Sequence, residues 1–563
     1  MGETASHVTG AKTTPLLNQT IGQALDAAAA RWGGLEALVS AHQGVRWTWA
    51  ELKARAEAFA AGLLALGLEP GDRIGVWSPN KSEWALTQFA AAKAGLILVT
   101  INPAYRLSEV EYTINKVGVK ALVAAESFKT SAYAEMIETL APEMATCPPG
   151  ALLAARLPTL TAAIKIGGDP RPGWLDFEAV SPLGTDETRA ALARIETERF
   201  PDEPINIQFT SGTTGLPKGA TLSHRNILNN GYFAGLGIGL VAGDRLCIPV
   251  PLYHCFGMVM GNLGCVTHGA VMVYPSDAFE AEAVLRTVEA ERCTGLYGVP
   301  TMFIAELAHP GFDRFDLSSL RTGAMGGSPC PVEVMKTVIE RMHMADVTIA
   351  YGMTETSPVS FQTGRDDPLD RRVSTVGKVH PNLECKVVDL DGETTPRGVA
   401  GELCTRGYSV MLGYWDDAAK TAEAIDPEGW MHTGDLATID EAGYGNIVGR
   451  IKDLVIRGGE NVYPLEVEEY LYRHPKVEDV TVVGVPDPRF GEELCAWIRL
   501  KSGEQATAEE ITAFCRGQIS HFKVPRYIRF VDAFPMTVTG KVQKFVIREA
   551  MIEELALSVE LTA

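Results

Sequence analysis

The chain has 563 residues, which is enough for more than one hydrophobic core. Hydrophobic residues make up 46% and charged residues 21% of it, as is ordinary for a soluble globular protein. The formal net charge of −20 argues against a general binder of nucleic acid or anionic membranes, which needs an exposed basic surface, but leaves room for a local basic pocket.

The ten cysteines are scattered and form no C-x-x-C pair, so reduced thiols in a reducing compartment are expected. The first residues lack a basic segment followed by an apolar one, so we expect no signal peptide and a cytoplasmic location. Residues 246–276 contain no Asp, Glu, Lys or Arg, but prolines, histidines and glycines interrupt them. We expect a buried strand–helix–strand core there, and no stable membrane insertion.

The first third of the chain alternates helical and strand-like segments. Thr48 and Glu51 form a capping box, and apolar residues at helical spacing follow it until Gly67. Strand-like segments come next, at 72–80, 96–103 and 121–126. Alternation of this kind predicts parallel strands joined by crossover helices. Residues 143–200 carry little pattern.

Further strand-like runs lie before Pro251 and at 271–275, 294–300 and 347–352. Each ends in small residues or prolines, as loops at the carboxyl edge of a parallel sheet often do, and ligands bind at that edge. After residue 383 the segments become shorter and more β-like. From Lys452 onward the pattern predicts a compact α+β unit of about a hundred residues.

The predicted fold is therefore α/β. A large N-terminal domain, residues 1–451, would hold α/β subdomains with mostly parallel sheets and a small β-rich part. A small α+β C-terminal domain would follow over residues 452–563.

The segment TSGTTGLPKG at 210–219 follows an apolar run and has the composition of a phosphate-holding loop. It is not a Walker loop, because Pro217 stands where that loop has glycine before the lysine, and Gly219 stands where it has a hydroxyl residue. The residues expected to hold phosphates are Thr210, Ser211, Gly212, Thr213, Thr214, Gly215 and Lys218.

Together with five later segments, this loop resembles the signature motifs of the adenylate-forming enzymes, which comprise acyl-CoA synthetases, nonribosomal adenylation domains and beetle luciferases. The later segments follow in the family's order: GGSPCP at 326–331, AYGMTETSP at 350–358, HTGDLATID at 432–440, GNIVGRIKDLVIRGGENVYP at 445–464 and PMTVTGKVQK at 535–544. The resemblance implies attack of a carboxylate on the α-phosphate of ATP, which gives an acyl-adenylate and pyrophosphate.

Because two anions must meet in that step, the resemblance implies positive charge beside the reacting oxygens. Glu355 matches the family's Mg²⁺ ligand, as suits a hard cation, and Thr354 matches a phosphate contact. Lys541 matches the lysine that bridges the α-phosphate and the substrate carboxylate. A regulatory protein that had lost catalysis would be expected to lack Glu355 or Lys541, and both are present.

The resemblance also supplies a nucleotide site. Asp435 matches the carboxylate that binds the ribose hydroxyls, and Arg450 matches a further ribose or phosphate contact. The adenine slot would be formed by Gly326, Gly327, Ser328, Ala350, Tyr351 and Gly352. For Tyr351 a role as a core aromatic residue is the alternative.

A second half-reaction follows in the family, with rotation of the small domain between the two steps. Lys452 matches the hinge position, so the C-terminal domain is expected to be mobile. Rotation would withdraw Lys541 and bring in Gly458 and Gly459, which resemble the glycines lining a coenzyme A channel. Coenzyme A is the expected acceptor, because no carrier domain or pantetheine-attachment motif is visible, and 233–239 offers no aspartate for an amino-acid substrate.

The candidate acyl pocket is apolar and rich in small residues: Phe256, Gly257, Met258, Gly261, Gly323, Met325 and Gly352. Gly352 stands where acetyl-type enzymes carry a tryptophan that closes the pocket, which favours a longer alkyl chain. His254 would either position the acyl carboxylate or pack against the adenylate. The resemblance is greatest to medium-chain or general fatty acyl-CoA synthetases; a ligase for an aryl, branched or sulfur-containing short acid is the alternative. The resemblance allows a homodimer, for which no interface pattern is visible.

Overall fold

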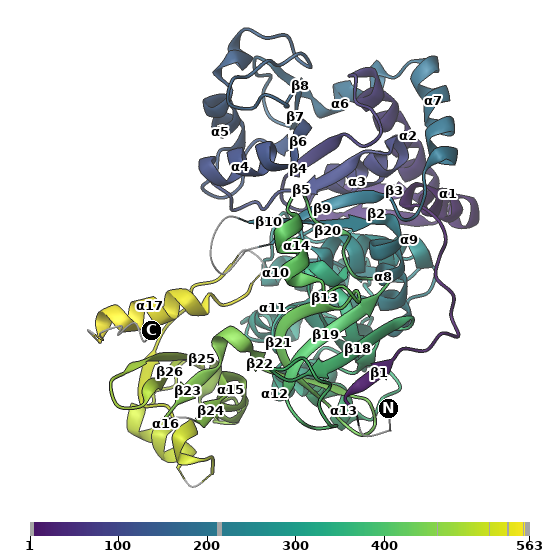
Figure 1. Ribbon diagram of the computed structural model, residues 1–563. Coiled ribbons are helices and arrows are strands. Elements are labelled where there is room, and N and C mark those ends of the chain that lie inside the picture. The colour runs from purple at the N-terminus through teal and green to yellow at the C-terminus, as the bar shows by residue number, and fades with distance from the viewer. Residues whose placement is uncertain are drawn as a thin grey trace.

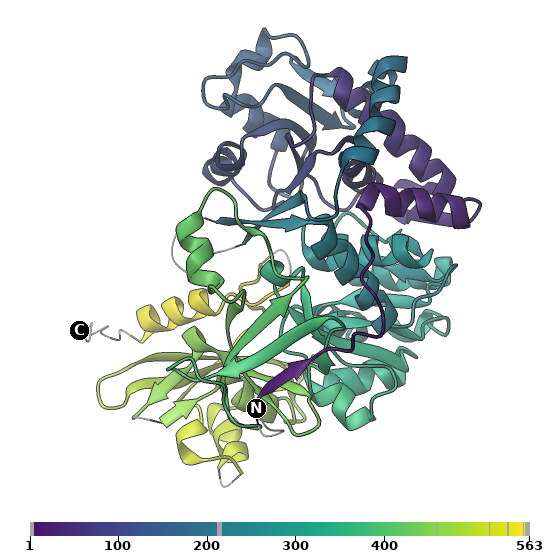
Figure 2. The same ribbon diagram turned by 45° about the vertical axis from the view of Figure 1, so that its right-hand side comes forward.

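The computed structural model describes residues 5–210, 217–458, 460–516, 518–537, 540–555 and 557. A large body contains the chain up to about residue 450, and a smaller unit at the C-terminal end lies beside it (Figures 1 and 2). Two mostly parallel sheets and one antiparallel sheet form the large body, and a further mixed sheet forms the small unit. This arrangement confirms the predicted α/β fold class.

The first parallel sheet occupies the upper part of Figure 1. Its strands, in spatial order, are β20 (Gly413–Tyr414), β10 (Lys218–Ser223), β9 (Pro204–Thr210), β5 (Ile97–Thr100), β4 (Arg73–Trp77), β6 (Val119–Ala125), β7 (Ala162–Ile166) and β8 (Trp174–Asp176). The pairs from β9 to β8 are parallel, whereas β10 is antiparallel to both of its neighbours.

The second parallel sheet is central. Its strands, in spatial order, are β17 (Lys378–Val379), β16 (Val359–Gln362), β15 (Asp346–Gly352), β14 (Thr322–Gly326), β13 (Gly295–Gly298), β11 (Arg245–Cys247), β12 (Val271–Tyr274), β2 (Glu36–Ser40) and β3 (Val45–Thr48). The strands from β15 to β2 are parallel, so the segments that follow β14 and β15 leave the same edge of the sheet.

The antiparallel sheet contains the β-like segments expected after residue 383. Its order is β1 (His7–Thr9), β18 (Leu383–Val388), β19 (Gly401–Gly407), β21 (Met431–Ile439) and β22 (Gly445–Arg450). Strand β1 comes from the N-terminal end and pairs with β18, so this sheet joins segments almost four hundred residues apart.

The helices of the large body cover the faces of these sheets. They are α1 (Ile21–Trp32), α2 (Trp49–Ala65), α3 (Ser82–Ala94), α4 (Leu107–Val117), α5 (Tyr133–Leu140), α6 (Phe177–Val180), α7 (Asp186–Glu198), α8 (His224–Gly237), α9 (Gly264–His268), α10 (Ala281–Glu291), α11 (Pro300–Leu307), α12 (Val332–Arg341), α13 (Leu369–Ser374) and α14 (Ala418–Ala424). The expected capping box begins α2: the Thr48 side chain accepts from the Glu51 N–H, and the Glu51 carboxylate accepts from the Thr48 N–H.

The small unit is built on one sheet. Its strands are β23 (Val455–Arg457), β24 (Glu460–Val462), β25 (Val477–Asp487), β26 (Gly491–Leu500) and β27 (Tyr527–Phe530), and its helices are α15 (Pro464–Leu471), α16 (Ala508–Cys515) and α17 (Lys544–Glu554). Buried Val467, Leu471, Val482, Ile498 and Ile511 give it a core of its own. A boundary at 451/452 stays a prediction.

Two stretches differ in how well the sequence predicted them. The uncharged segment 246–276 is buried strand–helix–strand core as expected, except that Phe256–Leu263 forms a π-helix. Residues 143–200, which showed little pattern, contain β7 and α7. Helix α7 buries only Leu192 and Ile195, so its apolar stripe is too narrow to stand out in the sequence.

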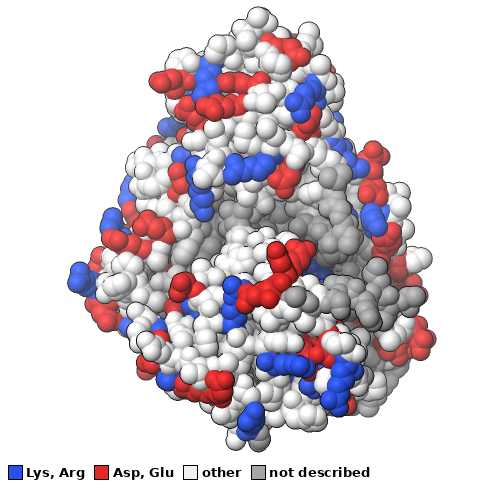
Figure 3. Space-filling model, turned by 90° about the vertical axis from the view of Figure 1, so that its left-hand side faces the viewer, with Lys and Arg blue, Asp and Glu red and all other residues white. Residues whose placement is uncertain are grey.

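Acidic and basic side chains are interspersed over the face shown in Figure 3 and do not separate by sign. Among the described residues, the helices are too short or too polar for any one to cross a membrane.

Candidate active site

The phosphate-loop segment connects two antiparallel strands. Thr210 ends β9 and Lys218 begins β10, and the two residues are paired in register. Ser211, Gly212, Thr213, Thr214 and Gly215 lie outside the described residues. The loop therefore starts and ends at one point on the edge of the first sheet, beside the central sheet (Figure 1).

Glu355 lies in a short 3₁₀ turn, Thr354–Thr356, that follows β15. Its carboxylate is buried, and Oε1 accepts a hydrogen bond of 2.9 Å from the hydroxyl of Tyr414. The Lys218 ammonium donates to the same hydroxyl at 3.1 Å and lies 4.2 Å from the centre of the ring. Tyr414 thus joins the phosphate-loop lysine to the predicted metal ligand.

Tyr414 was missed by sequence reasoning. It is 59 residues from Glu355, and it reaches the site because β20 pairs with β10 at the sheet edge. Burial, followed by the negative charge of Glu355, raises the pKa of Tyr414 far above its usual range, so the phenol keeps its proton and donates it to the carboxylate. No local pattern around the tyrosine signals this contact.

The predicted ribose contacts lie together, Asp435 within β21 and Arg450 at the end of β22. Asp435 is buried and pairs in register with Arg450. The Arg450 Nε donates to Oδ1 at 2.9 Å, and the Tyr351 hydroxyl donates to Oδ2 at 2.7 Å. An ionised carboxylate has about four acceptor sites, so Asp435 keeps capacity for ribose hydroxyls. Tyr351 is thereby tied to the ribose carboxylate as well as to the core.

The predicted adenine slot lies at the carboxyl ends of β14 and β15. Gly326 pairs with Ala350, and a Cβ at Gly326 would lie 2.6 Å from the Ala350 carbonyl oxygen. Gly327 follows with φ +84°, a conformation that favours glycine, and Ser328 comes next on the same loop. The small residues therefore permit a close approach of two strands at the edge where a ligand is expected.

Lys541 belongs to the small unit, yet its side chain lies at this site. A Cβ on Gly327 would be 3.8 Å from the Lys541 Cε, and the neighbouring Gly540 carbonyl accepts a hydrogen bond of 3.1 Å from Thr301. Burial and the positive charge of Arg450 lower the pKa of Lys541, whereas Asp435 and Glu355 oppose that lowering. The structure thus brings Lys541, Glu355, Asp435 and Arg450 to one place.

His254 and Cys255 lie at the same site. The His254 Nδ1 accepts from the Phe256 N–H at 3.2 Å, which leaves Nε2 as the protonated nitrogen of the neutral ring. Burial, helped by the positive charge of Lys541, lowers the pKa of His254 to about 3. Cys255 donates to Gln208 at 3.1 Å, and burial raises its pKa to about 12, so it is a packed thiol and not a thiolate nucleophile.

The low pKa of His254 predicts the shape of the pH profile. Because the ring is neutral at every pH above about 3, its charge does not change between pH 5 and 8. We expect the pH profile of pyrophosphate release to be the same near pH 6.5 in the wild type and in His254→Gln, because this histidine contributes no inflection there. An inflection that disappears in the variant would contradict the assigned environment.

The predicted acyl-pocket residues lie on the π-helix and on β14 and β15: Phe256, Gly257, Met258, Gly261, Gly323, Met325 and Gly352. A Cβ at Gly352 would lie 1.7 Å from the Pro358 carbonyl oxygen, and one at Gly257 would lie 2.4 Å from that of Pro251. Backbone packing therefore requires glycine at both positions, a reason that the expectation of an open pocket floor at Gly352 did not include. The pocket itself stays a prediction.

The predicted hinge and coenzyme A residues follow β22. Lys452 lies in the 3₁₀ turn Ile451–Asp453 between the two units, and burial lowers its pKa. Gly458 has φ +62° in the turn between β23 and β24, and its N–H donates to the Phe490 carbonyl. Gly459 lies outside the described residues.

Comparison with known proteins agrees with this geometry. Residues 25–415 match the family model described as AMP-binding enzyme, and residues 466–541 match that of the AMP-binding enzyme C-terminal domain. The mitochondrial medium-chain acyl-CoA ligase ACSF2 of Danio rerio is 48% identical to this protein. The alignment covers 98% of this chain and 92% of the Danio rerio chain.

Two solved structures share the fold. The anthranilate CoA ligase AuaEII, in complex with anthranoyl-AMP, has a TM-score of 0.86 and 27% identity, over 97% of this chain and 99% of its own. A fatty acyl CoA synthetase of Mycobacterium tuberculosis has a TM-score of 0.68 and 26% identity, over 95% of this chain and 99% of its own chain. The family-model match covers more than half of the chain, and the protein therefore belongs to the AMP-binding enzymes.

Proposed function

We propose that the protein is an ATP-dependent acid–CoA ligase that acts on medium- or longer-chain fatty acids. It converts the acid and ATP to an acyl-adenylate and pyrophosphate, and then transfers the acyl group to coenzyme A with release of AMP. The observation that carries the proposal is the position of Lys541: a lysine from the small unit lies among Glu355, Asp435 and Arg450 of the large one.

In the first step, the residues assigned to ATP hold it for in-line attack at the α-phosphate. Asp435, fixed by Tyr351 and Arg450, orients the ribose, while Lys541 places one positive charge between the acyl carboxylate and the α-phosphate. A lysine is suited to this role because it is a compact charge on a flexible stem. Neutral His254 adds no charge, so it contributes through packing or a single N–H donor.

Glu355 would hold Mg²⁺, and Thr354 beside it would contact a phosphate. A buried carboxylate is an oxygen donor of the kind that this hard cation prefers. When bound, Mg²⁺ would neutralise charge that develops on the phosphate oxygens. Tyr414 holds the Glu355 carboxylate in one orientation through its hydrogen bond to Oε1.

In the second step the thiol of coenzyme A must reach the acyl carbonyl. Lys541 occupies the site in the orientation described above, so the small unit has to move before the thiol can enter. Rotation at Lys452 would exchange Lys541 for the turn that contains Gly458. Cytoplasmic location and a homodimeric state stay predictions.

The choice of acid is supported by the relatives and by the apolar walls near the π-helix. The name of the Danio rerio protein gives a medium-chain substrate, and that chain covers nearly all of this one. The anthranilate CoA ligase is less similar in sequence, at 27% identity against 48%, but its structure is similar, and it keeps an aryl acid as the alternative. Burial of each CH₂ contributes about 0.8 kcal/mol, so kcat/KM should depend on the chain length of the fatty acid.

A substrate panel tests this proposal. Pyrophosphate, AMP and ADP are measured with ATP, Mg²⁺, coenzyme A and acids from acetate to palmitate, with benzoate and anthranilate alongside. We expect AMP and pyrophosphate as products, and a kcat/KM that rises about fourfold per added CH₂ until the pocket is filled. Release of ADP, or the absence of acid-stimulated pyrophosphate release, would refute the ligase. A preference for benzoate or anthranilate would establish the alternative acid.

A further inference from the structure

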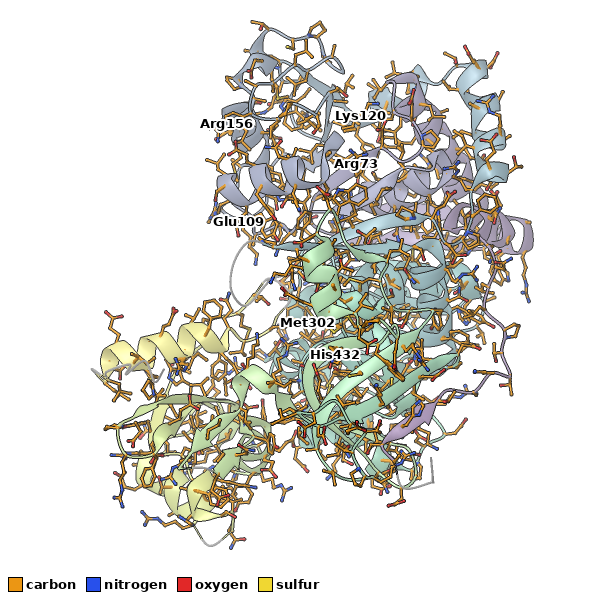
Figure 4. All side chains as sticks on the ribbon, in the orientation of Figure 1. Arg73, Glu109, Lys120, Arg156, Met302 and His432 are labelled. Carbon is orange, nitrogen blue, oxygen red and sulfur yellow. The ribbon has the colours of Figure 1, made fainter. Side chains whose placement is uncertain are left out.

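Three side chains with metal-binding atoms gather on the antiparallel sheet, apart from the residues assigned to ATP. Glu402 and Cys404 lie on β19. His432, which is labelled in Figure 4, lies opposite Cys404 on β21. The Cys404 Sγ is 3.5 Å from the His432 Nδ1, and a Glu402 carboxylate oxygen is 2.9 Å from the same nitrogen. All three ligand atoms lie within 4.8 Å of one another.

We propose that Glu402, Cys404 and His432 form a binding site for a zinc-type transition-metal ion. Thiolate, imidazole and carboxylate are the ligands that Zn²⁺ takes in proteins, whereas Mg²⁺ prefers oxygen alone. Tetrahedral zinc with bonds of about 2.3 Å to sulfur and about 2.0 Å to nitrogen holds those two atoms roughly 3.5 Å apart. The observed sulfur–nitrogen separation has that value, so the ion can enter without movement of either strand once the Glu402 carboxylate, now hydrogen-bonded to the same nitrogen, shifts by a few tenths of an ångström.

The surrounding groups hold these ligands in orientations that suit a metal. Asp426 Oδ2 lies 3.8 Å from the other His432 nitrogen, Nε2, and the Gly434 N–H donates to Glu402 Oε1 at 3.1 Å. Asp426 is itself fixed, because its Oδ1 accepts from the N–H groups of Glu428 and Trp430. A carboxylate on the far nitrogen of a ligating histidine is the usual means of setting the ring's orientation and basicity.

Burial and charge are also compatible with an ion. Cys404 is fully buried against Val388 and Trp430, while His432 and Glu402 are partly exposed, so the ion would enter from the side of the latter two. Lys386 and Arg406 both lie over Trp430, and Arg406 is paired with Glu384, so the carboxylates of Glu402 and Asp426 outweigh the remaining ammonium of Lys386. Burial raises the pKa of Cys404 to about 12, so metal binding would release the thiol proton.

The role that follows is structural. The three ligands join β19 to β21 where their register shifts, between Glu402 and Cys404. An ion there would cross-link the two strands three residues before Asp435 and would stabilise the folded chain by binding it preferentially. The site does not depend on the proposed ligase activity.

The test uses the full-length protein after treatment with a chelator and dialysis. Zinc is titrated in competition with a chromophoric chelator, and we expect one equivalent per chain together with a rise in Tm. Cys404→Ser and His432→Gln should each lower the zinc affinity by at least about tenfold. Cobalt added in place of zinc should give a sulfur-to-cobalt charge-transfer band that Cys404→Ser abolishes.

Matched variants make the result decisive. Cys385→Ser removes another buried thiol of the same sheet, one that lies 3.5 Å from the Thr405 hydroxyl, and it should leave the cobalt band and the affinity unchanged. Asp426→Asn should weaken binding while keeping the band, because it alters only the support of His432. Because His432 and Glu402 are partly exposed, His432→Gln and Glu402→Gln should fold even if Cys404→Ser does not.

Two results would overturn the proposal. One is that the wild type binds no zinc at micromolar free concentration. The other is that Cys404→Ser, His432→Gln and Glu402→Gln all bind zinc as the wild type does. Either result would leave the three side chains as a hydrogen-bonded contact between the strands, in which His432 donates to Glu402. Loss of ligase activity in the substrate panel would not bear on either result.

Discussion

Replacement of Lys541 by alanine is expected to lower the rate of acyl-adenylate formation by roughly 10²–10³-fold, the loss typical of removing one charge aimed at the reacting atoms. The reason is its position: the ammonium group lies with Glu355, Asp435 and Arg450 and is the predicted bridge between the carboxylate and the α-phosphate. Pyrophosphate release in the presence of octanoate measures this step. Thioester formation from supplied octanoyl-adenylate should fall only by a factor of a few.

The control for this experiment is Lys523→Ala, another lysine of the small unit, whose ammonium pairs with Glu466. Because a partly exposed ion pair contributes little stability, both half-reactions should stay near the wild-type rate. Equal loss of the two half-reactions in Lys541→Ala would contradict the assigned role. It would indicate that the substitution disturbs docking of the small unit as a whole.

Two substitutions around Glu355 should lower adenylation by different amounts. Glu355→Gln removes the negative charge expected to bind Mg²⁺ and should reduce kcat/KM for ATP by roughly 10²–10³-fold. Tyr414→Phe keeps the carboxylate but removes the hydrogen bond to Oε1, which at about 1.5 kcal/mol corresponds to a loss of about tenfold. The Mg²⁺ concentration at half-maximal rate should rise in both variants.

Tyr408→Phe is the matched control for Tyr414→Phe. Tyr408 is a half-buried tyrosine in the segment after β19, and its buried hydroxyl lies beside Asn230 and not beside Glu355. It should therefore leave the Mg²⁺ dependence unchanged. If Tyr414→Phe behaves in the same way, the tyrosine does not position the carboxylate, and its contact with Lys218 and Glu355 is packing alone.

Much of the fold follows from local sequence. The capping box at Thr48 and Glu51 begins a helix because its two hydrogen bonds satisfy backbone N–H groups that have no partner within the helix. Strands β4, β5 and β6 are short apolar runs between turn signals, and their alternation with helices predicts a parallel sheet. Helix α7 escaped prediction because it buries so little of its surface.

The chemistry of the site was also visible in the sequence, but its geometry was not. Each motif names a residue type and its neighbours along the chain, which is enough to assign roles to Glu355, Asp435 and Lys541. The motif does not specify what each side chain touches. Gly352 illustrates the difference: its position suggested an open pocket floor, whereas the structure shows a backbone carbonyl where a side chain would begin.

The sequence by itself determined the fold class, the family resemblance and the residues expected to perform adenylation, because helix caps, strand alternation and motif spacing are short-range properties. Only the tertiary structure decided that Tyr414 joins Lys218 to Glu355, that the small unit is docked in the orientation that brings Lys541 to the nucleotide site, and that Glu402, Cys404 and His432 converge. Each of these contacts joins residues on separate strands or separate units. The pairing of strands and the docking of units bring such residues together. Because these residues lie far apart along the chain, no local sequence pattern signals their contacts.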